Sequence, residues 1–326
     1  MRVLVTGASG FVGQQLCREL AAHDFAVRAL ARRALHDLLP GDVELVQGEI
    51  SDQGVVRFAV DGVDAIVHLA ARVHVMRDQA ADPLAEFRRV NVDGTRLLAT
   101  AAREAGVKHI VFASSVKAVG DVSVTPWTSS TPPFPMDAYG VSKLEAEQLL
   151  LARSVDAQLR INVLRFPLVY GPGMKGNMLR LFRLIDRGGP IPVGRPANAR
   201  SVLFVGNAVA AITQVLDRIA SDRSRHASSH PLFVADGPAQ STAALVQTIA
   251  GALGVPSRTI SMPSGALRSL ARLTDPLTRA RLGPKLDRLL GSLEVDECEF
   301  QREFDFQPPF TLQRGMEITA GWFRQS

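Results

Sequence analysis

The sequence predicts an α/β protein: a doubly wound parallel sheet with helices on both faces, followed by a smaller α/β lobe. Short apolar segments alternate with longer amphipathic ones through residues 1–170, which is the pattern of strand–helix–strand units. A glycine-spaced turn separates the first predicted strand from the first predicted helix. Glycine and proline then crowd the span 171–194, as expected of short elements joined by loops.

The individual elements follow from the apolar runs and their spacing. We expect strands at residues 3–5, 25–30, 43–46, 65–68, 110–113 and 162–165, and helices at residues 11–23, 84–105, 139–153 and 207–220. The last of these helices is expected to return to the first sheet. The predicted division is therefore a first domain of residues 1–170, to which 202–236 return, and a second lobe of residues 171–201 and 237–326.

Composition restricts the class of protein. The chain has 326 residues, of which 46% are hydrophobic and 21% are charged, so it can bury a core and is not a disordered polymer. The net charge of +5 and the pI of about 9.7 fit an anionic small ligand such as a diphosphate. A nucleic-acid partner is not expected, because the arginines are scattered and aromatic residues make up only 6%.

Cysteine usage and hydropathy point to the cytoplasm. Cys17 and Cys298 match no metal-ligand spacing, so we expect free thiols and no metal. The apolar start of the chain is interrupted by Gly7 and is too short for a signal peptide. No later uncharged apolar run reaches the roughly 18 residues of a membrane span, so no membrane partner is expected.

The run TGASGFVG, directly after the first strand, predicts a dinucleotide site. Gly7, Gly10 and Gly13 let the backbone turn sharply and approach a pyrophosphate. The helix that follows, beginning near Phe11 and Val12, presents free N–H groups and the positive end of its dipole. We therefore expect NAD or NADP on the first domain, which makes it the dinucleotide-binding domain of a Rossmann-type fold.

The end of the second strand distinguishes the two cofactors. An acid there would hold the 2′-hydroxyl of NAD, whereas an arginine pairs with the 2′-phosphate of NADP. The chain reads Ala31-Arg32-Arg33, so NADP is favoured and Arg32 is the expected contact; the alternative is an exposed basic turn. Further cofactor contacts are expected after the third and fourth strands, at Glu49, Ile50, Leu69, Ala70 and Ala71.

Tyr139 and Lys143 are candidate catalytic residues because they lie four apart at a helix start and share a helix face. A tyrosine hydroxyl has a pKa of about 10, and a neighbouring ammonium lowers it, so the hydroxyl can act as a general acid or base. Ser114 and Ser115 end the fifth strand at the edge where such sheets bind ligands, and one of them should hydrogen-bond the reacting oxygen. Asn91 either relays protons or caps local backbone.

Six motifs in this order resemble the extended short-chain dehydrogenase/reductases that act on nucleotide sugars, the UDP-galactose 4-epimerase-like epimerase/dehydratase family. They are TGASGFVG, HLAA (68–71), NVDGT (91–95), FASS (112–115), YGVSK (139–143) and LRFPLVYGP (164–172), and the resemblance covers nearly the whole chain. It implies that Ser115 and Tyr139 are catalytic, with Lys143 as partner of the tyrosine. It also implies nicotinamide contacts at Phe166 and Leu168, a sugar-nucleotide contact at Asn177 and a diphosphate contact at Arg200.

Departures from the family pattern narrow the reaction. Dehydratases of the family carry an Asp–Glu pair just after the catalytic hydroxyl residue, where this chain has Val116 and Lys117, so 4,6-dehydration is not expected. Val119 stands where the family often has tyrosine. The runs AARVHVMRD, SSVKAVG, LVYGPGMKGN and RLLGSLEVD resemble members linked to bacterial surface-polysaccharide synthesis, which include 4-epimerases and reductases of UDP-4-keto-6-deoxy-N-acetylhexosamines.

Three hypotheses follow. The favoured one is a 4-ketoreductase, in which NADPH gives a hydride to carbon 4 of a UDP-4-keto-6-deoxy sugar and Tyr139 gives the proton. The alternative is a 4-epimerase of UDP-glucose or UDP-N-acetylglucosamine, in which the same residues first oxidise and then reduce carbon 4 with a retained NAD. A non-catalytic NADP-binding scaffold is the remote alternative, because such scaffolds typically lose the tyrosine or the lysine.

The resemblance also implies an assembly. In relatives, the two long helices pair with those of a second subunit to form a four-helix bundle. Here these helices are the ones predicted at 84–105 and 139–153, so a homodimer with two-fold symmetry is expected. The alternative is that the two helices only cover the sheet.

Overall fold

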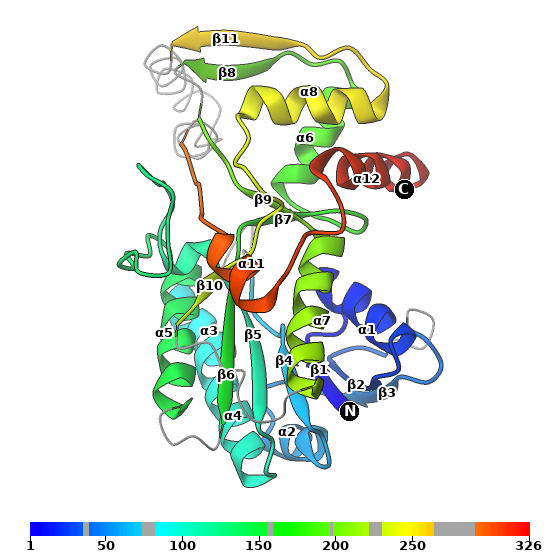
Figure 1. The fold of residues 1–326 in the computed structure, drawn as a ribbon, viewed down its shortest axis with the longest axis vertical. Helices are drawn as coiled ribbons and strands as arrows, with labels where there is room; N and C mark the ends of the chain where they lie inside the picture. Colours follow the sequence, from blue (N-terminus) through cyan, green and yellow to red (C-terminus); the bar gives the residue numbers. More distant parts are fainter. Residues whose placement is uncertain (35–38, 74–81, 155–158, 196–197, 222–229, 264–290) are drawn as a thin grey trace.

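A computed structural model describes residues 1–34, 39–73, 82–154, 159–195, 198–221, 230–263 and 291–326. The chain forms a sheet covered by helices and, above it in Figure 1, a smaller lobe that contains the C-terminal helix. Parts of the predicted second lobe, of the returning segment and of the runs AARVHVMRD and RLLGSLEVD lie outside the described residues.

Seven parallel strands form the main sheet, in the order β10-β6-β5-β4-β1-β2-β3. The chain runs from β1 outward to β3, then returns beside β1 as β4 and runs outward in the other direction, which confirms the doubly wound fold. The strands are β1 Arg2–Thr6, β2 Ala26–Ala31, β3 Glu44–Gln47, β4 Ala65–His68, β5 His109–Ser115, β6 Arg160–Phe166 and β10 Leu232–Phe233.

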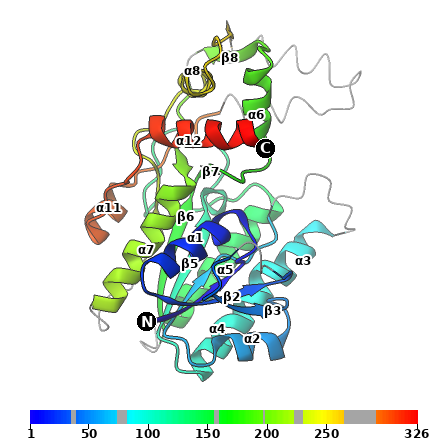
Figure 2. The same ribbon diagram turned by 90° about the vertical axis from the view of Figure 1, so that its right-hand side faces the viewer.

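Helices cover both faces of this sheet. In Figure 2, α1 and α7 lie on one side of the strands and α2, α3 and α4 on the other. Two separate apolar clusters, one on each face, hold these layers together. The helices are α1 Phe11–Ala22, α2 Gln53–Val60, α3 Pro83–Arg88, α4 Gly94–Glu104, α5 Ala138–Ser154 and α7 Val205–Ser221.

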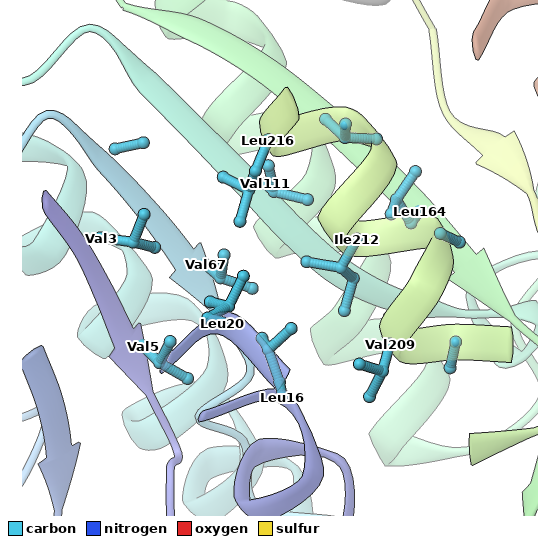
Figure 3. Packing of buried hydrophobic residues seen from close by; sticks show 14 of the residues in the cluster. Val3, Val5, Leu16, Leu20, Val67, Val111, Leu164, Val209, Ile212 and Leu216 are labelled. Atoms are coloured by element: carbon cyan, nitrogen blue, oxygen red, sulfur yellow. The ribbon is translucent and has the colours of Figure 1, made fainter. Parts of the chain in front are cut away.

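The face covered by α1 and α7 carries a continuous apolar core (Figure 3). Its strand residues alternate along the chain, because successive side chains of a strand point to opposite faces of the sheet. The helical contributions are spaced three or four residues apart, as one face of a helix requires. The labelled members are Val3, Val5, Leu16, Leu20, Val67, Val111, Leu164, Val209, Ile212 and Leu216.

The second lobe contains short elements around its own apolar cluster. Two small parallel sheets pair β8 with β11 and β7 with β9. Its elements and those that join it to the sheet are β7 Leu168–Tyr170, α6 Asn177–Asp186, β8 Ile191–Arg195, β9 Val202–Phe204, α8 Thr242–Leu253, β11 Thr259–Pro263, α11 Cys298–Phe304 and α12 Leu312–Gln325. Among the described residues, no helix has both the length and the apolar character needed to cross a bilayer.

The predicted strands and most predicted helices agree with the structure to within two residues at each end. The helix expected at 84–105 is different: α3 and α4 are separated by a π-helical segment, η1 Arg89–Asp93, that contains Asn91. Helix α2 was not predicted, although Asp52 caps it by accepting a hydrogen bond from the Val55 N–H at 3.1 Å. In the returning segment, β9 pairs with β7 while α7 and β10 pack on and extend the main sheet.

Candidate active site

The glycine turn after β1 forms a tight cradle beside the chain that follows β4. Gly7 has a φ of +72°, and a Cβ there would lie 2.7 Å from the Ala70 nitrogen. A Cβ on Gly13 would collide with the Gly7 carbonyl oxygen, which also accepts a hydrogen bond from the Gly10 N–H at 2.9 Å. Close backbone packing within the turn therefore requires glycine at both positions.

The first turn of α1 is suited to an anion. Gly10 precedes the helix and has no side chain to occupy its first N–H groups, and the first turn contains no acid. Free N–H groups and the positive end of the helix dipole therefore face the turn, so these residues fit the pyrophosphate of a dinucleotide. Phe11 and Val12 are partly buried against the core cluster of the second lobe, which places the cradle at the junction of the two lobes.

The outer residues expected to contact the cofactor occupy the neighbouring strand ends. Arg32 is exposed directly after β2, and the exposed Glu49 accepts a hydrogen bond from Ser51 at 3.2 Å. Ile50 is 8% exposed and packs beside Gly94 in α4. The residues that follow β4 are partly buried next to the glycine turn, namely Leu69, Ala70 and Ala71.

Tyr139 lies in the first turn of α5, half-buried, with its ring centroid 6.0 Å from that of Phe87. Burial raises the pKa of Tyr139 to about 12, the hydrogen bond with the Ser115 side chain lowers it, and the negative charge of Asp137 raises it. The lowered pKa expected from the Tyr139–Lys143 spacing is therefore wrong for the protein alone, because desolvation of the phenolate outweighs the stabilising hydrogen bond.

Lys143 is 3% exposed and reaches the end of β5. Its ammonium donates a hydrogen bond to the Ala113 carbonyl at 2.6 Å and lies 4.1 Å from the centroid of the Phe112 ring. Burial lowers the pKa of Lys143 to about 7, and the negative charge of Glu147 opposes that shift. A group with this pKa can gain or lose a proton near neutral pH.

The two serines at the end of β5 point in opposite directions, as neighbours in a strand do. The Ser114 hydroxyl donates a hydrogen bond to Glu147, which forms an ion pair with Arg165 at 2.7 Å. Both partners of that pair are buried. The Ser115 hydroxyl accepts a hydrogen bond from the Lys117 N–H at 3.2 Å and interacts with Tyr139. Of the two serines, Ser115 is the one beside the candidate acid–base residue.

Asn91 bridges three segments of the site. Its amide donates to Ser142 Oγ at 2.9 Å and to the Arg72 carbonyl at 3.0 Å, and its carbonyl accepts from the Arg72 N–H at 2.7 Å. Ser142 in turn donates to the Tyr139 carbonyl at 2.7 Å. The π-helical segment directs the Asn91 side chain toward α5, and these contacts fix the first turn of that helix.

A buried histidine, which the sequence reasoning did not assign, lies beneath the site. His68 Nδ1 is 2.7 Å from Thr6 Oγ1, and its Nε2 is 2.9 Å from Thr95 Oγ1, which donates to the Asn91 carbonyl. Burial, with a smaller contribution from Lys143, lowers the pKa of His68 to about 3, so the ring is neutral at physiological pH. Its signal in the sequence was a single polar residue at the end of the apolar strand AIVH.

The residues expected to contact the sugar nucleotide, Asn177 and Arg200, lie on the second lobe, and those expected to contact the nicotinamide, Phe166 and Leu168, lie at the strand ends below it. Asn177 is exposed as the first residue of α6, and Leu168 is 43% exposed at the start of β7. Phe166 is buried at the end of β6. Arg200 is partly buried and donates to the Gly291 carbonyl at 2.7 Å; burial lowers its pKa and the Asp121 carboxylate opposes that shift.

These contacts describe acid–base machinery at the carboxyl end of a parallel sheet. A tyrosine held by a serine and an adjacent buried lysine provide groups that can move a proton. They lie on the strand β5 and helix α5, two strands from the glycine cradle on β1. Ligands of open α/β sheets bind at this edge, where the strand order reverses.

Among the described residues, no cluster of three or more His, Cys, Asp or Glu side chains could hold a metal ion.

Comparison with known proteins gives the family. Residues 3–228 match the NAD dependent epimerase/dehydratase family. A UDP-glucose 4-epimerase of Vibrio cholerae is 34% identical over 99% of this chain and 96% of its own length. The N-acetyl-alpha-D-glucosaminyl-diphospho-ditrans,octacis-undecaprenol 4-epimerase of Escherichia coli O157:H7 is 29% identical over 97% of this chain and 93% of its own. The structure of MoeE5 in complex with UDP-glucose and NAD is 29% identical, has a TM-score of 0.78 and covers 100% of this chain and 99% of its own. The chain belongs to the NAD-dependent epimerase/dehydratase family.

Proposed function

We propose that this protein moves a hydride and a proton at carbon 4 of a UDP-hexose or UDP-N-acetylhexosamine. The observation that carries the proposal is that Ser115 at the end of β5, Tyr139 at the start of α5 and the buried Lys143 gather at the carboxyl edge of a sheet whose first turn is a glycine cradle. The MoeE5 complex with UDP-glucose and NAD supports the substrate class.

The residues divide the chemistry between them. A bound nicotinamide cofactor supplies the hydride chemistry and, when oxidised, a positive charge near the reacting carbon. Ser115 orients the oxygen on carbon 4, and Tyr139 gives a proton to that oxygen when it is a ketone or takes one when it is a hydroxyl. Lys143, with a pKa of about 7, lies one turn further along α5 than Tyr139, and we assign it the role of stabilising the phenolate when it is charged.

Two polar side chains of the second lobe, Arg200 and Asn177, are suited to contact the sugar nucleotide. Arg200 presents a guanidinium, whose fork suits a diphosphate better than an ammonium does. Asn177 at the start of α6 can hydrogen-bond the sugar or the nucleotide. We assign both residues to the sugar nucleotide, and we assign the segments 171–201 and 237–326 to the lobe that binds it.

The first candidate direction is reduction of a UDP-4-keto-6-deoxy sugar by NADPH. Arg32 favours it, because β2 is followed by an exposed arginine and no acid at the position that meets the adenosine ribose. A cofactor that must leave after each turnover is consistent with NADP. Lys117, at a position where family dehydratases carry an acid, argues against loss of water.

The second candidate is 4-epimerisation of UDP-glucose or UDP-N-acetylglucosamine. The Vibrio cholerae and Escherichia coli relatives, both named as 4-epimerases, support it over nearly the full chain. The same residues serve both candidates, because an epimerase performs the oxidation and the reduction of carbon 4 in turn.

One experiment separates the candidates. Purified protein is first examined for retained nicotinamide cofactor. It is then incubated with UDP-glucose, with UDP-N-acetylglucosamine and with a UDP-4-keto-6-deoxy-N-acetylhexosamine, each in the presence of NADH or of NADPH. The products are identified by mass spectrometry and NMR. Stoichiometric NADPH consumption by the keto-sugar identifies the reductase. Interconversion of 4-epimers by protein that keeps its NAD identifies the epimerase.

The variant Tyr139→Phe tests the assigned acid–base residue. It should lose turnover by a factor on the order of 10²–10⁴ while binding the cofactor as before, because only a hydroxyl is removed. Unchanged turnover of any substrate would favour a different base. Cofactor binding without any sugar turnover in the native protein would favour the non-catalytic scaffold.

We also propose a homodimer through α3, α4 and α5. A surface groove runs between these helices, lined by Arg88, Val92, Asp93, Arg96, Glu145, Gln148 and Leu149. The partly buried Leu149 and the charges of both signs in this groove suit a two-fold contact with a second copy. Light scattering of the native protein and of Leu149→Arg tests this: the native chain should have twice the mass of the variant.

A further inference from the structure

A row of alternating charges leads from the start of α5 toward the second lobe. The Lys117 ammonium lies 2.5 Å from Asp121 Oδ1 and 3.5 Å from Asp137 Oδ2. The side chains of Lys117, Asp121 and Asp137 are 25%, 19% and 24% exposed. Three charged groups that are mostly removed from water form a defined arrangement rather than a fully solvated surface pair.

Both ends of Lys117 contact the catalytic segments. Its backbone N–H donates to Ser115 Oγ at 3.2 Å, and its carbonyl oxygen lies so close to Gly140 that a side chain there would collide with it. Its ammonium contacts Asp137, which accepts hydrogen bonds from the Gly140 N–H at 2.8 Å and, through its carbonyl, from the Val141 N–H at 3.0 Å. Asp137 therefore caps the helix turn that carries Tyr139, and Lys117 holds that cap.

The charges around Tyr139 come from several elements. Lys143 lies one turn along α5, Asp137 precedes the helix, and Ser115 faces the hydroxyl from β5. The Phe87 ring lies against the Tyr139 ring, and the Arg72 guanidinium lies 5.4 Å from the centroid of the Phe87 ring.

The electrostatic consequence of Asp137 has a known sign. Its carboxylate raises the pKa of Tyr139 and so opposes formation of the phenolate. A cation bound to that carboxylate reduces its field at the tyrosine. Asp121, the other partner of Lys117, opposes the lowering of the Arg200 pKa, which links the same row of charges to the lobe assigned to the diphosphate.

We propose that Lys117 is a positioning residue for Tyr139: by holding Asp137, it fixes the first turn of α5 against Ser115 and sets the pH range over which Tyr139 exchanges its proton. The inference rests on the proposed function, because it assigns Tyr139 the acid–base role. The proposed role also explains why a lysine can stand at residue 117, where dehydratases of the family carry an acid.

The direct test is the titration of Tyr139 in protein saturated with NAD⁺. The chain has only two tyrosines, and Tyr170 is fully buried with a pKa raised far above its usual range. With ¹³Cζ-labelled tyrosine, only the Tyr139 resonance, identified by its loss in Tyr139→Phe, should therefore move with pH. Lys117→Met should raise its midpoint by about one pH unit, a tenfold fall in phenolate at fixed pH. Asp137→Asn should lower the midpoint.

Matched variants test whether Lys117 acts on Tyr139 through Asp137. Lys117→Arg should restore the native midpoint, since it keeps the charge, and Lys108→Met, which removes an exposed lysine at the other end of β5, should leave it unchanged. In an Asp137→Asn background, Lys117→Met should shift the midpoint by much less than in the native chain. A native midpoint in Lys117→Met, or a full shift in the Asp137→Asn background, would overturn the inference.

Kinetics provide the second readout. During oxidation of a UDP-sugar, kcat rises with pH as Tyr139 loses its proton. In Lys117→Met this rise should shift to higher pH by the same number of pH units as the midpoint of the Tyr139 resonance. KM should change less than kcat. Equal kcat profiles in the native and Lys117→Met proteins contradict the inference. Absence of turnover in the native protein with every sugar would refute the proposed function, while the titration of Tyr139 would still decide the role of Lys117.

Discussion

Two neighbouring serines at the end of β5 show how residue position decides role. The hydroxyl of Ser114 is committed to the buried Glu147–Arg165 pair, whereas that of Ser115 meets Tyr139. The first serine therefore supports the sheet–helix contact, and the second faces the candidate chemistry. Strand position alone treats the two serines as equivalent, because both are small hydroxyl residues at the same strand end; the family resemblance singled out Ser115 as catalytic.

The two serines give a matched prediction. Ser115→Ala should lower kcat on the order of 10²-fold with little change in thermal stability, because it removes a hydrogen bond to the reacting groups. Ser114→Ala should leave kcat within a few-fold but lower the free energy of unfolding by about 1–3 kcal/mol, because Glu147 loses a buried donor. Steady-state kinetics and urea denaturation measure the two effects, and the reverse pattern would contradict the assignment.

A second residue-scale prediction concerns the glycine cradle. Gly7→Ala forces a Cβ against the Ala70 nitrogen at a φ of +72°, so it should destabilise the protein and weaken NAD(P) binding at least tenfold. Gly251→Ala is the matched control: a Cβ there meets nothing within 4 Å inside α8, and it should stabilise the helix by about 0.5–1 kcal/mol. Isothermal titration with each cofactor and thermal unfolding measure both. Unaltered binding by Gly7→Ala would place the cofactor elsewhere.

At the scale of elements, His68 joins four secondary-structure elements. It connects Thr6 at the end of β1, its own strand β4 and Thr95 in α4, and its ring stacks on Phe112 of β5 with centroids 5.4 Å apart. The strands that carry the glycine turn, the small residues after β4 and the candidate catalytic serine are thereby held in fixed register. A neutral imidazole suits this place, because it can donate at one nitrogen and accept at the other.

This histidine should make stability depend on pH. The pKa of His68 in the folded protein, about 3, lies below the ordinary histidine value of 6.5, so between those values the unfolded chain binds a proton that the folded protein does not. Its contribution to stability is therefore complete above pH 6.5 and falls by about 1.4 kcal/mol per pH unit toward pH 3. Calorimetry at pH 5 in buffers of different ionisation enthalpy should show about one proton more taken up on unfolding than in His68→Gln. Equal uptake would mean that His68 is charged in the folded protein.

At the scale of the molecule, the two lobes meet through a buried amide. Asn207 in α7 donates to Asp236 at 2.7 Å and to the Phe310 carbonyl at 2.8 Å, and accepts from the Phe310 N–H at 3.0 Å. Asp236 also accepts from the Phe204 N–H at 2.8 Å. The segments after β10, before α12 and at β9 are thus fixed to one helix, which sets the second lobe over the sheet edge.

Removing this amide should loosen the junction. Asn207→Ala leaves the N–H and carbonyl of Phe310 without partners and removes one donor from the Asp236 carboxylate, so the free energy of unfolding should fall by about 3 kcal/mol. KM for the sugar nucleotide should rise more than kcat falls, because the lobes are no longer held in register. Gln313→Ala, which removes one surface hydrogen bond to Glu317, is the control and should change stability by less than about 0.5 kcal/mol. Equal effects of both variants would refute a special role for Asn207.

Local patterns in the sequence determined much of this protein. The strands, the glycine turn and the serine, tyrosine and lysine of the candidate site were predictable, because apolar periodicity and backbone requirements act over a few residues. The π-helical segment at Asn91 was not predictable: its distortion is maintained by bonds to Ser142 and Arg72, which are distant along the chain.

The tertiary structure alone decided the electrostatics. Burial and partners from other elements set the raised pKa of Tyr139, the pKa of Lys143 near 7 and the place of Lys117 between two acids. Desolvation and charge–charge energies depend on the surroundings in three dimensions, and a sequence lists its charges without their distances. The sequence by itself therefore determined which groups are present at the site, and the fold determined how acidic each of them is.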